Sequence, residues 1–154
     1  MEKPLIETNT TVNADAQQVW RTLTAGKSAM FMGADVDTDW KEGSPISFTG
    51  EFKGKPYRDH GEIRTVDEGR ELAFTHFSPM SGKPDVDKPD VEENYNLVDI
   101  RLSPDGERTK VSVSQTPLGG ERPDDQTIDE HRRNWDAMLG GLKQAAEERA
   151  FSDG

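Results

Sequence analysis

Residues 126–149 read QTIDEHRRNWDAMLGGLKQAAEER, and their apolar side chains recur at the period of an α-helix. When successive residues are placed about 100° apart, the apolar positions fall within one arc, while polar residues such as Asp136 and Lys143 fall outside it. A helix with one apolar face must bury that face against another layer of the protein. The stretch therefore predicts a long C-terminal helix that covers a sheet. The arc consists of Ile128, His131, Trp135, Met138, Leu139, Leu142, Ala145 and Ala146.

The covered sheet is predicted from residues 46–116, where apolar and polar residues alternate in short segments separated by turn signals. Gly54, Gly69 and Gly106 mark three of these turns. Alternation puts one set of apolar side chains on a shared face and polar side chains on the other, as in an antiparallel sheet that is wetted on one side. The apolar face consists of Ile46, Phe48, Phe52, Leu72, Phe74, His76, Val98, Ile100, Leu102, Val111 and Val113.

The N-terminal part adds a strand and two short helices to this plan. Residues 4–12 are rich in Thr and predict a first strand. Asp15 offers an N-cap side chain to a helix whose apolar stripe begins at Val19. Residues 27–33 predict a second short helix or turn. The predicted fold class is α+β, in the order strand, two short helices, six strands joined as hairpins, and the long helix.

The length of 154 residues fits one domain, because single cores commonly span about 100–200 residues. Residues 78–94 are long and polar and predict a flexible loop, and residues 150–154 predict a disordered tail. Two interpretations of the loop stay open, a solvated insertion and a lid over a cavity.

Composition excludes several classes of partner. The chain has 30 acidic and 19 basic residues, and its net charge of −11 argues against binding to nucleic acid or to anionic lipid. No apolar run is long enough for a membrane span, and the N-terminus lacks the apolar segment of a secretory signal, so we expect no membrane insertion and a cytoplasmic protein. With no cysteine, disulfides, thiolate zinc sites and cysteine nucleophiles are all excluded.

Short motifs occur in a fixed order along nearly the whole chain. They comprise Val19, Trp20 and Leu23; Gly61, Ile63 and Val66; Gly69, Arg70, Leu72, Phe74 and Thr75; Val98, Ile100 and Leu102; Thr109, Val111 and Val113; and Trp135, Leu139 and Leu142. In this order they resemble the START-like superfamily, also called Bet v 1-like or SRPBCC. Within it, the chain is similar to the family named after the C-terminal domain of the activator of Hsp90 ATPase. Phe31 and the segment 42–44 stand where that family often has a tryptophan and paired glycines.

The resemblance implies a helix-grip fold, in which a curved antiparallel sheet wraps around the C-terminal helix and encloses an apolar cavity. Strand and helix alternation then predicts which side chains line this cavity. If consecutive strands pair antiparallel, His76, Asn96, Gln115 and His131 gather at one end of the groove as a polar end. The predicted ligand-binding residues are Phe31, Trp40, Phe48, Phe52, Phe74, His76, Asn96, Gln115, His131, Trp135, Met138 and Leu139.

Catalytic and metal-binding patterns are missing from the sequence. It has no nucleophile elbow, no H-E-x-x-H pair and no phosphate-binding glycine loop, so we assign no catalytic residue, metal or cofactor. Asp99 alternates with Val98 and Ile100 onto the solvent face beside Arg101, which makes it a poor candidate for an acid of raised pKa.

Three functional hypotheses therefore stay open. The first is a binder of a small apolar or amphipathic molecule without catalysis, and the second is a cyclase-like or hydrolase-like enzyme that uses His76 or His131. The third is a protein-interaction module, such as an Hsp90 cofactor, as the family name suggests. An exposed sheet face or edge could also pair two copies into a homodimer.

Overall fold

The computed structural model describes residues 5–25, 27–28, 30–31, 34–52, 54–77, 95–119 and 123–153. The predicted loop at 78–94 lies outside these residues. Within these residues the structure has ten elements, whose bounds are β1 (Ile6–Val12), α1 (Ala16–Leu23), β2 (Lys27–Ser28), β3 (Ala34–Asp37), β4 (Pro45–Phe52), β5 (Lys55–Asp67), β6 (Glu71–His76), β7 (Asn96–Asp105), β8 (Arg108–Pro117) and α2 (Asp125–Asp153).

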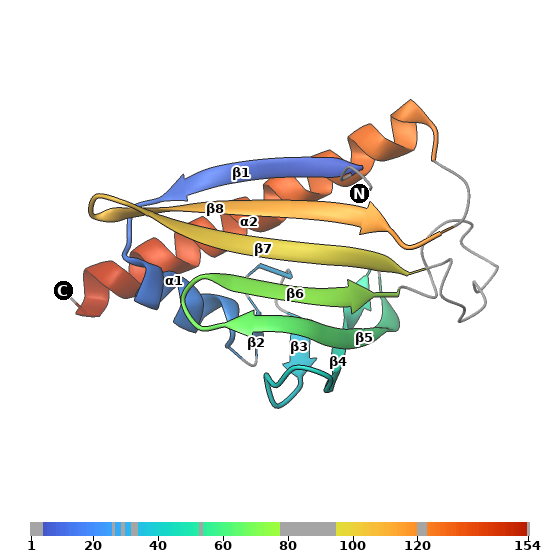
Figure 1. The fold of residues 1–154 in the computed structure, drawn as a ribbon, viewed down its shortest axis with the longest axis horizontal. Helices are drawn as coiled ribbons and strands as arrows, with labels where there is room; N and C mark the ends of the chain where they lie inside the picture. The colour runs from blue at the N-terminus through green and yellow to red at the C-terminus, as the bar shows by residue number, and fades with distance from the viewer. Residues whose placement is uncertain are drawn as a thin grey trace.

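The described strands form one antiparallel sheet in the order β1-β8-β7-β6-β5-β4-β3-β2. Strands β2 to β7 each pair with the next strand along the chain, and β1 joins the last strand, β8, from Ile6 opposite Gln115 to Val12 opposite Thr109. Helix α2 runs along one face of the sheet, behind β1, β8 and β7 in Figure 1. The predicted α+β class, an antiparallel sheet with a long C-terminal helix packed on it, is confirmed.

The core lies between α2 and the apolar face of the sheet. Phe74, Ile100 and Val113 are fully buried on the strands, and Leu139 and Leu142 are fully buried on the helix. These residues are the ones that the two periodicities place on facing surfaces, because side chains two apart on a strand and three or four apart on a helix share a face. Burial of apolar side chains is the dominant favourable term in folding, so this contact holds the two layers together.

Helix α2 also covers the free edge of β1. The Lys143 Nζ donates to the Thr11 carbonyl at 3.0 Å, the Asn13 backbone N–H donates to Glu147 Oε2 at 2.9 Å, and the Thr8 hydroxyl bonds Asp136. An uncovered edge strand presents unpaired backbone groups to other chains. Side chains of α2 occupy part of that edge here.

The first helix forms as predicted. Asp15 is its N-cap and accepts a hydrogen bond from the Gln18 backbone N–H at 2.9 Å, and Val19, Trp20 and Leu23 are buried. An N-cap of this kind satisfies one of the backbone donors that a helix leaves unpaired at its start. At the other end of the chain, α2 is described to Asp153, past residue 149 where the sequence pattern ends it.

The prediction of a second short helix over residues 27–33 is wrong. Within the described part of that segment, Lys27–Ser28 is a strand and Met30 and Phe31 form a turn that leads into β3. Met30 is completely buried, and tertiary burial therefore holds the segment in place. Strand β3 reads Ala-Asp-Val-Asp, and one central apolar residue between two aspartates is too short to show a strand period.

Candidate functional site

Four aromatic rings from four different segments meet between the helix and the sheet, and we call them the aromatic cluster: Phe31, Phe48, Phe74 and Trp135. The Phe31 ring centroid lies 4.9 Å from that of Phe48 and 6.2 Å from those of Phe74 and Trp135, and the Phe48 and Phe74 centroids are 5.5 Å apart. All pairs are tilted or edge-on, the arrangements that aromatic quadrupoles favour. Phe31 is half-buried and the other three rings are buried.

The cluster follows from alternation on two strands and from the period of α2. Phe48 on β4 and Phe74 on β6 point to the face that α2 covers, and Trp135 reaches them from the helix. Phe31 arrives from the turn before β3. The structure thus brings together four of the predicted cavity residues, while their role in ligand binding stays a prediction.

A polar edge borders the aromatic cluster beside Phe48, and we define it as Tyr57, Asp59 and His76. The His76 ring centroid lies 5.5 Å from that of Phe48, and His76 Nε2 lies 3.2 Å from Asp59 Oδ2. Asp59 stands opposite Phe48 in the β4–β5 register. The Asp59 side chain is 16% exposed and that of His76 is 27% exposed, so both groups are largely withdrawn from water yet still accessible.

Tyr57 lies next to Asp59 on the same face of β5 and crosses onto β4 at Gly50. A Cβ added to Gly50 would come within 2.8 Å of the Tyr57 hydroxyl, so the absence of a side chain at this position makes room for the ring. Burial raises the pKa of Tyr57 above its ordinary value, and the nearby charge of Asp59 raises it further. The hydroxyl is therefore protonated at neutral pH.

Sequence reasoning missed both Asp59 and Tyr57. Neither residue was assigned to the inner face, because Gly61 interrupts the alternation that connects Asp59 to the buried Ile63. Counting back in steps of two from Ile63, through Gly61, would have placed Asp59 and then Tyr57 on the inner face. This alternation was the sequence signal that could have identified both residues.

Gln115 has a structural partner in the core. Trp135 Nε1 donates a hydrogen bond to Gln115 Oε1 at 2.6 Å, and both side chains are buried. Asn96 stands opposite His76 in the β6–β7 register, whereas Gln115 stands opposite Val98, two residues further along. The predicted polar end is therefore divided, with Gln115 bound to the helix and His76 bound to Asp59.

The remaining predicted residues lie around this centre. His131, one turn before Trp135, and Met138 are half-buried, and Leu139 is buried. Trp40 lies in the loop between β3 and β4, half-buried against the core, with a φ angle of 60°. The side chain of Phe52 lies outside the described part of the structure.

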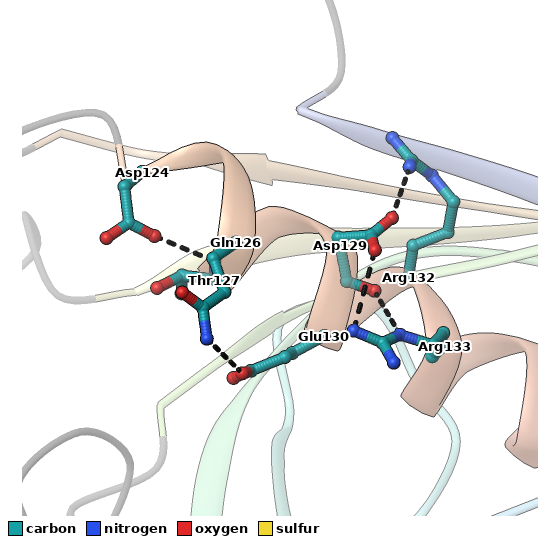
Figure 2. Close-up of polar contacts among 7 residues, drawn as sticks. All are labelled: Asp124, Gln126, Thr127, Asp129, Glu130, Arg132 and Arg133. Atoms are coloured by element: carbon teal, nitrogen blue, oxygen red, sulfur yellow. Dashed lines mark hydrogen bonds and ion pairs between the residues drawn. The ribbon is translucent and has the colours of Figure 1, made fainter.

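The exposed side of α2 near its start carries a chain of polar contacts (Figure 2). Asp124 Oδ1 accepts from the Thr127 backbone N–H at 2.8 Å, which caps the helix. The Thr127 side chain and then this backbone N–H lower the pKa of Asp124. Asp129 pairs with Arg132 at 3.3 Å and with Arg133 at 3.5 Å. These contacts keep one side of α2 polar, and the opposite side carries Trp135 to the aromatic cluster.

Three of the surface hollows on the described residues have no member of the aromatic cluster in their lining. One, of about 650 Å³, lies over β4 and β5 near His60 and Arg58. Another, of about 400 Å³, lies between His60, Tyr95 and Leu118. The rings of the cluster occupy the space between α2 and the sheet.

The expectation that the pKa of Asp99 stays near its ordinary value is wrong. The neighbours of Asp99 leave only 17% of the side chain exposed, although it lies on the face opposite Val98 and Ile100, and Oδ1 is buried with no partner among the described residues. The pKa of Asp99 is raised to about 6, first by burial and then by the hydrogen bond and charge of Glu71, while Arg101 at 3.1 Å opposes the shift. Alternation predicts the face of a strand but not how closely neighbouring side chains cover it.

We expect Asp99→Asn to stabilise the protein at neutral pH and to leave it unchanged in acid. Because the folded pKa of about 6 exceeds the ordinary value of 3.8, the folded state holds an extra proton between these values, and stability is lost as pH rises through this window. Removing the charge should raise the free energy of unfolding by about 1–2 kcal/mol at about pH 7.5 and by almost nothing below about pH 4, as measured by urea denaturation.

Asp129→Asn on the exposed face of α2 is the matched control, with a change within about 0.5 kcal/mol at both pH values. An equal effect of Asp99→Asn at both pH values would contradict the burial argument.

Two further properties hold for the described residues. No helix among them is long and apolar enough to cross a membrane. No group of three or more of their histidine, aspartate and glutamate side chains could hold a metal ion.

Comparison with known families decides the classification. Residues 13–147 match the family model described as Activator of Hsp90 ATPase homolog 1-like protein. The chain belongs to this family. The match spans most of the chain, from the residues before α1 into the last turns of α2, and it confirms the resemblance inferred from the sequence motifs.

Solved structures agree with the family assignment. A Cytophaga hutchinsonii protein solved in solution is 35% identical, with a TM-score of 0.75 over 97% of this chain and 98% of that one. The Aha1 dimer from Colwellia psychrerythraea is 17% identical, with a TM-score of 0.66 over 92% and 95% of the two chains. DynU16, from the dynemicin biosynthetic locus, is 17% identical with a TM-score of 0.71, over 92% of this chain and 46% of its own. No curated protein matches the chain.

Proposed function

We propose that this protein binds a small apolar or amphipathic molecule at the boundary between the aromatic cluster and the polar edge, without catalysing a reaction. The observation that carries the proposal is the meeting of four aromatic rings from four segments beside a partly accessible His76–Asp59 pair. Small-molecule sites typically combine an apolar lining with a few polar groups that fix orientation.

Phe31 is the ring that makes entry of a ligand feasible. It is half-buried, it is held by a turn, and it contacts all three other rings of the cluster. Its displacement would open a space bordered by Phe48, Phe74 and Trp135, with His76 at its end. A planar molecule could then replace the contacts that Phe31 makes, since offset and edge-on ring contacts stabilise by about 0.5–1.5 kcal/mol each.

The proposal predicts that neutral aromatic compounds bind next to Trp135. Titration with 2-naphthol or a flavonoid should shift the NMR signal of the Trp135 indole N–H, which Trp135→Phe identifies by its disappearance. Phe31→Leu should tighten this binding by about tenfold, because the ligand then displaces a side chain that no longer makes ring contacts with the cluster. Tyr95→Leu is the matched control, since Tyr95 is a half-buried ring that stacks on Phe77 outside the cluster. Absence of any shift at millimolar ligand would count against the proposal.

A second candidate function is favoured by the contact between His76 and Asp59. A carboxylate bound to a ring nitrogen orients an imidazole as a general base, and this arrangement would suit a cyclase-like or hydrolase-like reaction. In that case His76→Ala abolishes turnover of a bound substrate, whereas Phe31→Leu mainly lowers its KM. The homodimer and the Hsp90 partner remain predictions, and the dimeric Colwellia relative supports the first of them.

A further inference from the structure

The polar edge holds a carboxylate that lacks part of its hydrogen bonding. Asp59 Oδ2 lies 3.2 Å from His76 Nε2, whereas Asp59 Oδ1 is buried and has no hydrogen-bond partner among the described residues. A buried acceptor without a donor costs stability, and the cost is larger when the acceptor carries charge. A hydrogen-bond donor on a ligand would remove that cost, so Asp59 favours ligands that carry such a donor.

The electrostatic surroundings of Asp59 disfavour anions. Within the described ranges, no lysine or arginine forms an ion pair with Asp59, and the chain carries a net charge of −11. The negative field extends to Tyr57, whose pKa is raised by burial and then by the charge of Asp59. A second carboxylate placed in this partly dehydrated region would be repelled by Asp59, and no described lysine or arginine is paired with Asp59 to offset that repulsion.

The part of the aromatic cluster beside Asp59 favours a positively charged or aromatic ligand. The Phe48 ring stands opposite Asp59 in the β4–β5 register and contacts both His76 and Phe31. Ring faces attract cations within about 6 Å of the centroid, and they stack on aromatic ligands as well. The same position therefore offers an aryl surface and a hydrogen-bond acceptor, side by side.

We infer that the ligand of this site is an aromatic molecule with a hydrogen-bond donor at its edge, an amine or a phenolic hydroxyl, that binds Asp59, and that the site discriminates against aryl carboxylates of the same shape. This inference rests on the proposed function and adds the chemical class of its ligand. Tyr57, whose ring lies over Gly50, is the neighbour of Asp59 on the same face of β5.

Four naphthalene probes test the inference on the intact chain. Donor strength is compared between 2-naphthol and 2-methoxynaphthalene, which lacks the hydroxyl hydrogen, and charge is compared between 2-naphthylmethylamine and 2-naphthoate. Dissociation constants from calorimetry, with the Trp135 indole N–H signal as a local readout, should show 2-naphthol binding about fivefold to tenfold more tightly than its methyl ether. The amine should bind at least about tenfold more tightly than the carboxylate.

Asp59→Asn is the matching substitution, because it keeps the shape of the side chain and removes its charge. It should reduce the preference for the amine over the carboxylate to within about threefold, whereas Asp129→Asn on the exposed face of α2 should leave that preference unchanged. The wild-type comparison of the four probes decides the inference even if Asp59→Asn does not fold.

The outcomes separate the two proposals. If none of the four probes shifts the Trp135 signal, the proposed binding function fails, and this inference fails with it. If the probes bind but 2-naphthoate binds as tightly as the amine, or the methyl ether as tightly as 2-naphthol, the binding function stands and the donor inference is overturned. An unchanged amine preference in a folded Asp59→Asn protein also overturns it.

Discussion

Gly61→Ala is expected to destabilise the fold by about 3 kcal/mol or more, which would lower the melting temperature by about 6–12 °C for a chain of this size. A Cβ at this position would lie 1.7 Å from the backbone carbonyl oxygen of Thr75 and 3.1 Å from its hydroxyl oxygen. Because the nearest atom belongs to the backbone of β6, no rotation of a side chain relieves the overlap.

The surroundings of Gly61 explain why the two strands approach so closely there. His60 and Phe77 exchange backbone hydrogen bonds of 3.0 and 2.7 Å, and the Glu62 backbone N–H donates to Thr75 Oγ1 at 2.9 Å. A register irregularity follows between Ile63 and Thr65. Separating β5 from β6 to admit a methyl group would break contacts on both sides of the glycine.

The control for Gly61→Ala is Gly140→Ala in α2, where an added Cβ meets no atom within 4 Å. This change should stabilise the protein by about 0.5–1 kcal/mol, because glycine is a poor helix former. Urea denaturation of both variants measures the difference. A Gly61→Ala protein as stable as the unmodified chain would show that the two strands separate easily.

Trp135→Phe should cost about 2–4 kcal/mol of stability. The substitution removes the indole N–H that donates to Gln115 Oε1 at 2.6 Å and leaves this acceptor buried without its donor. It also removes part of a ring that is 7% exposed and contacts Phe31, so packing around it is lost. Chemical denaturation measures the loss.

A double substitution separates the hydrogen bond from the packing. Adding Gln115→Leu to Trp135→Phe replaces both polar partners by apolar groups, so the double variant should recover about 1 kcal/mol relative to Trp135→Phe alone. Gln115→Leu in the unmodified chain should destabilise, because it leaves the indole donor without its acceptor. If the double variant is less stable than both single variants, the hydrogen bond is not the term that the single substitutions remove.

Much of the fold could be predicted because its signals are local and repeated. Phe74 and Ile100 alternate with polar neighbours on their strands, and Leu139 and Leu142 recur at the helical period, so each residue indicated its own face. Strand β3 could not be predicted in this way, since Val36 is its one central apolar residue and a single apolar position shows no strand period. The buried Met30, which anchors the preceding turn, likewise depends on tertiary contacts.

The candidate site was likewise predicted mainly where its residues lie in strongly periodic segments. Phe48, Phe74 and Trp135 were predicted because strong periodicity surrounds them, whereas Asp59 was missed because Gly61 breaks the alternation on β5. The degree of burial could not be predicted either: Asp99 faces away from the core as expected, yet its neighbours cover it and raise its pKa to about 6.

By itself, the sequence determined which faces of the strands and of the long helix are apolar, and therefore that a sheet and a C-terminal helix close on one another. The tertiary structure alone decided that Asp59 reaches His76, that Trp135 bonds Gln115, and that Thr75 lies directly over Gly61. The physical reason is the distance along the chain over which each property is set. Periodicity is a property of neighbouring residues, whereas hydrogen-bond partners, steric overlap and dehydration depend on atoms that only the folded chain brings together.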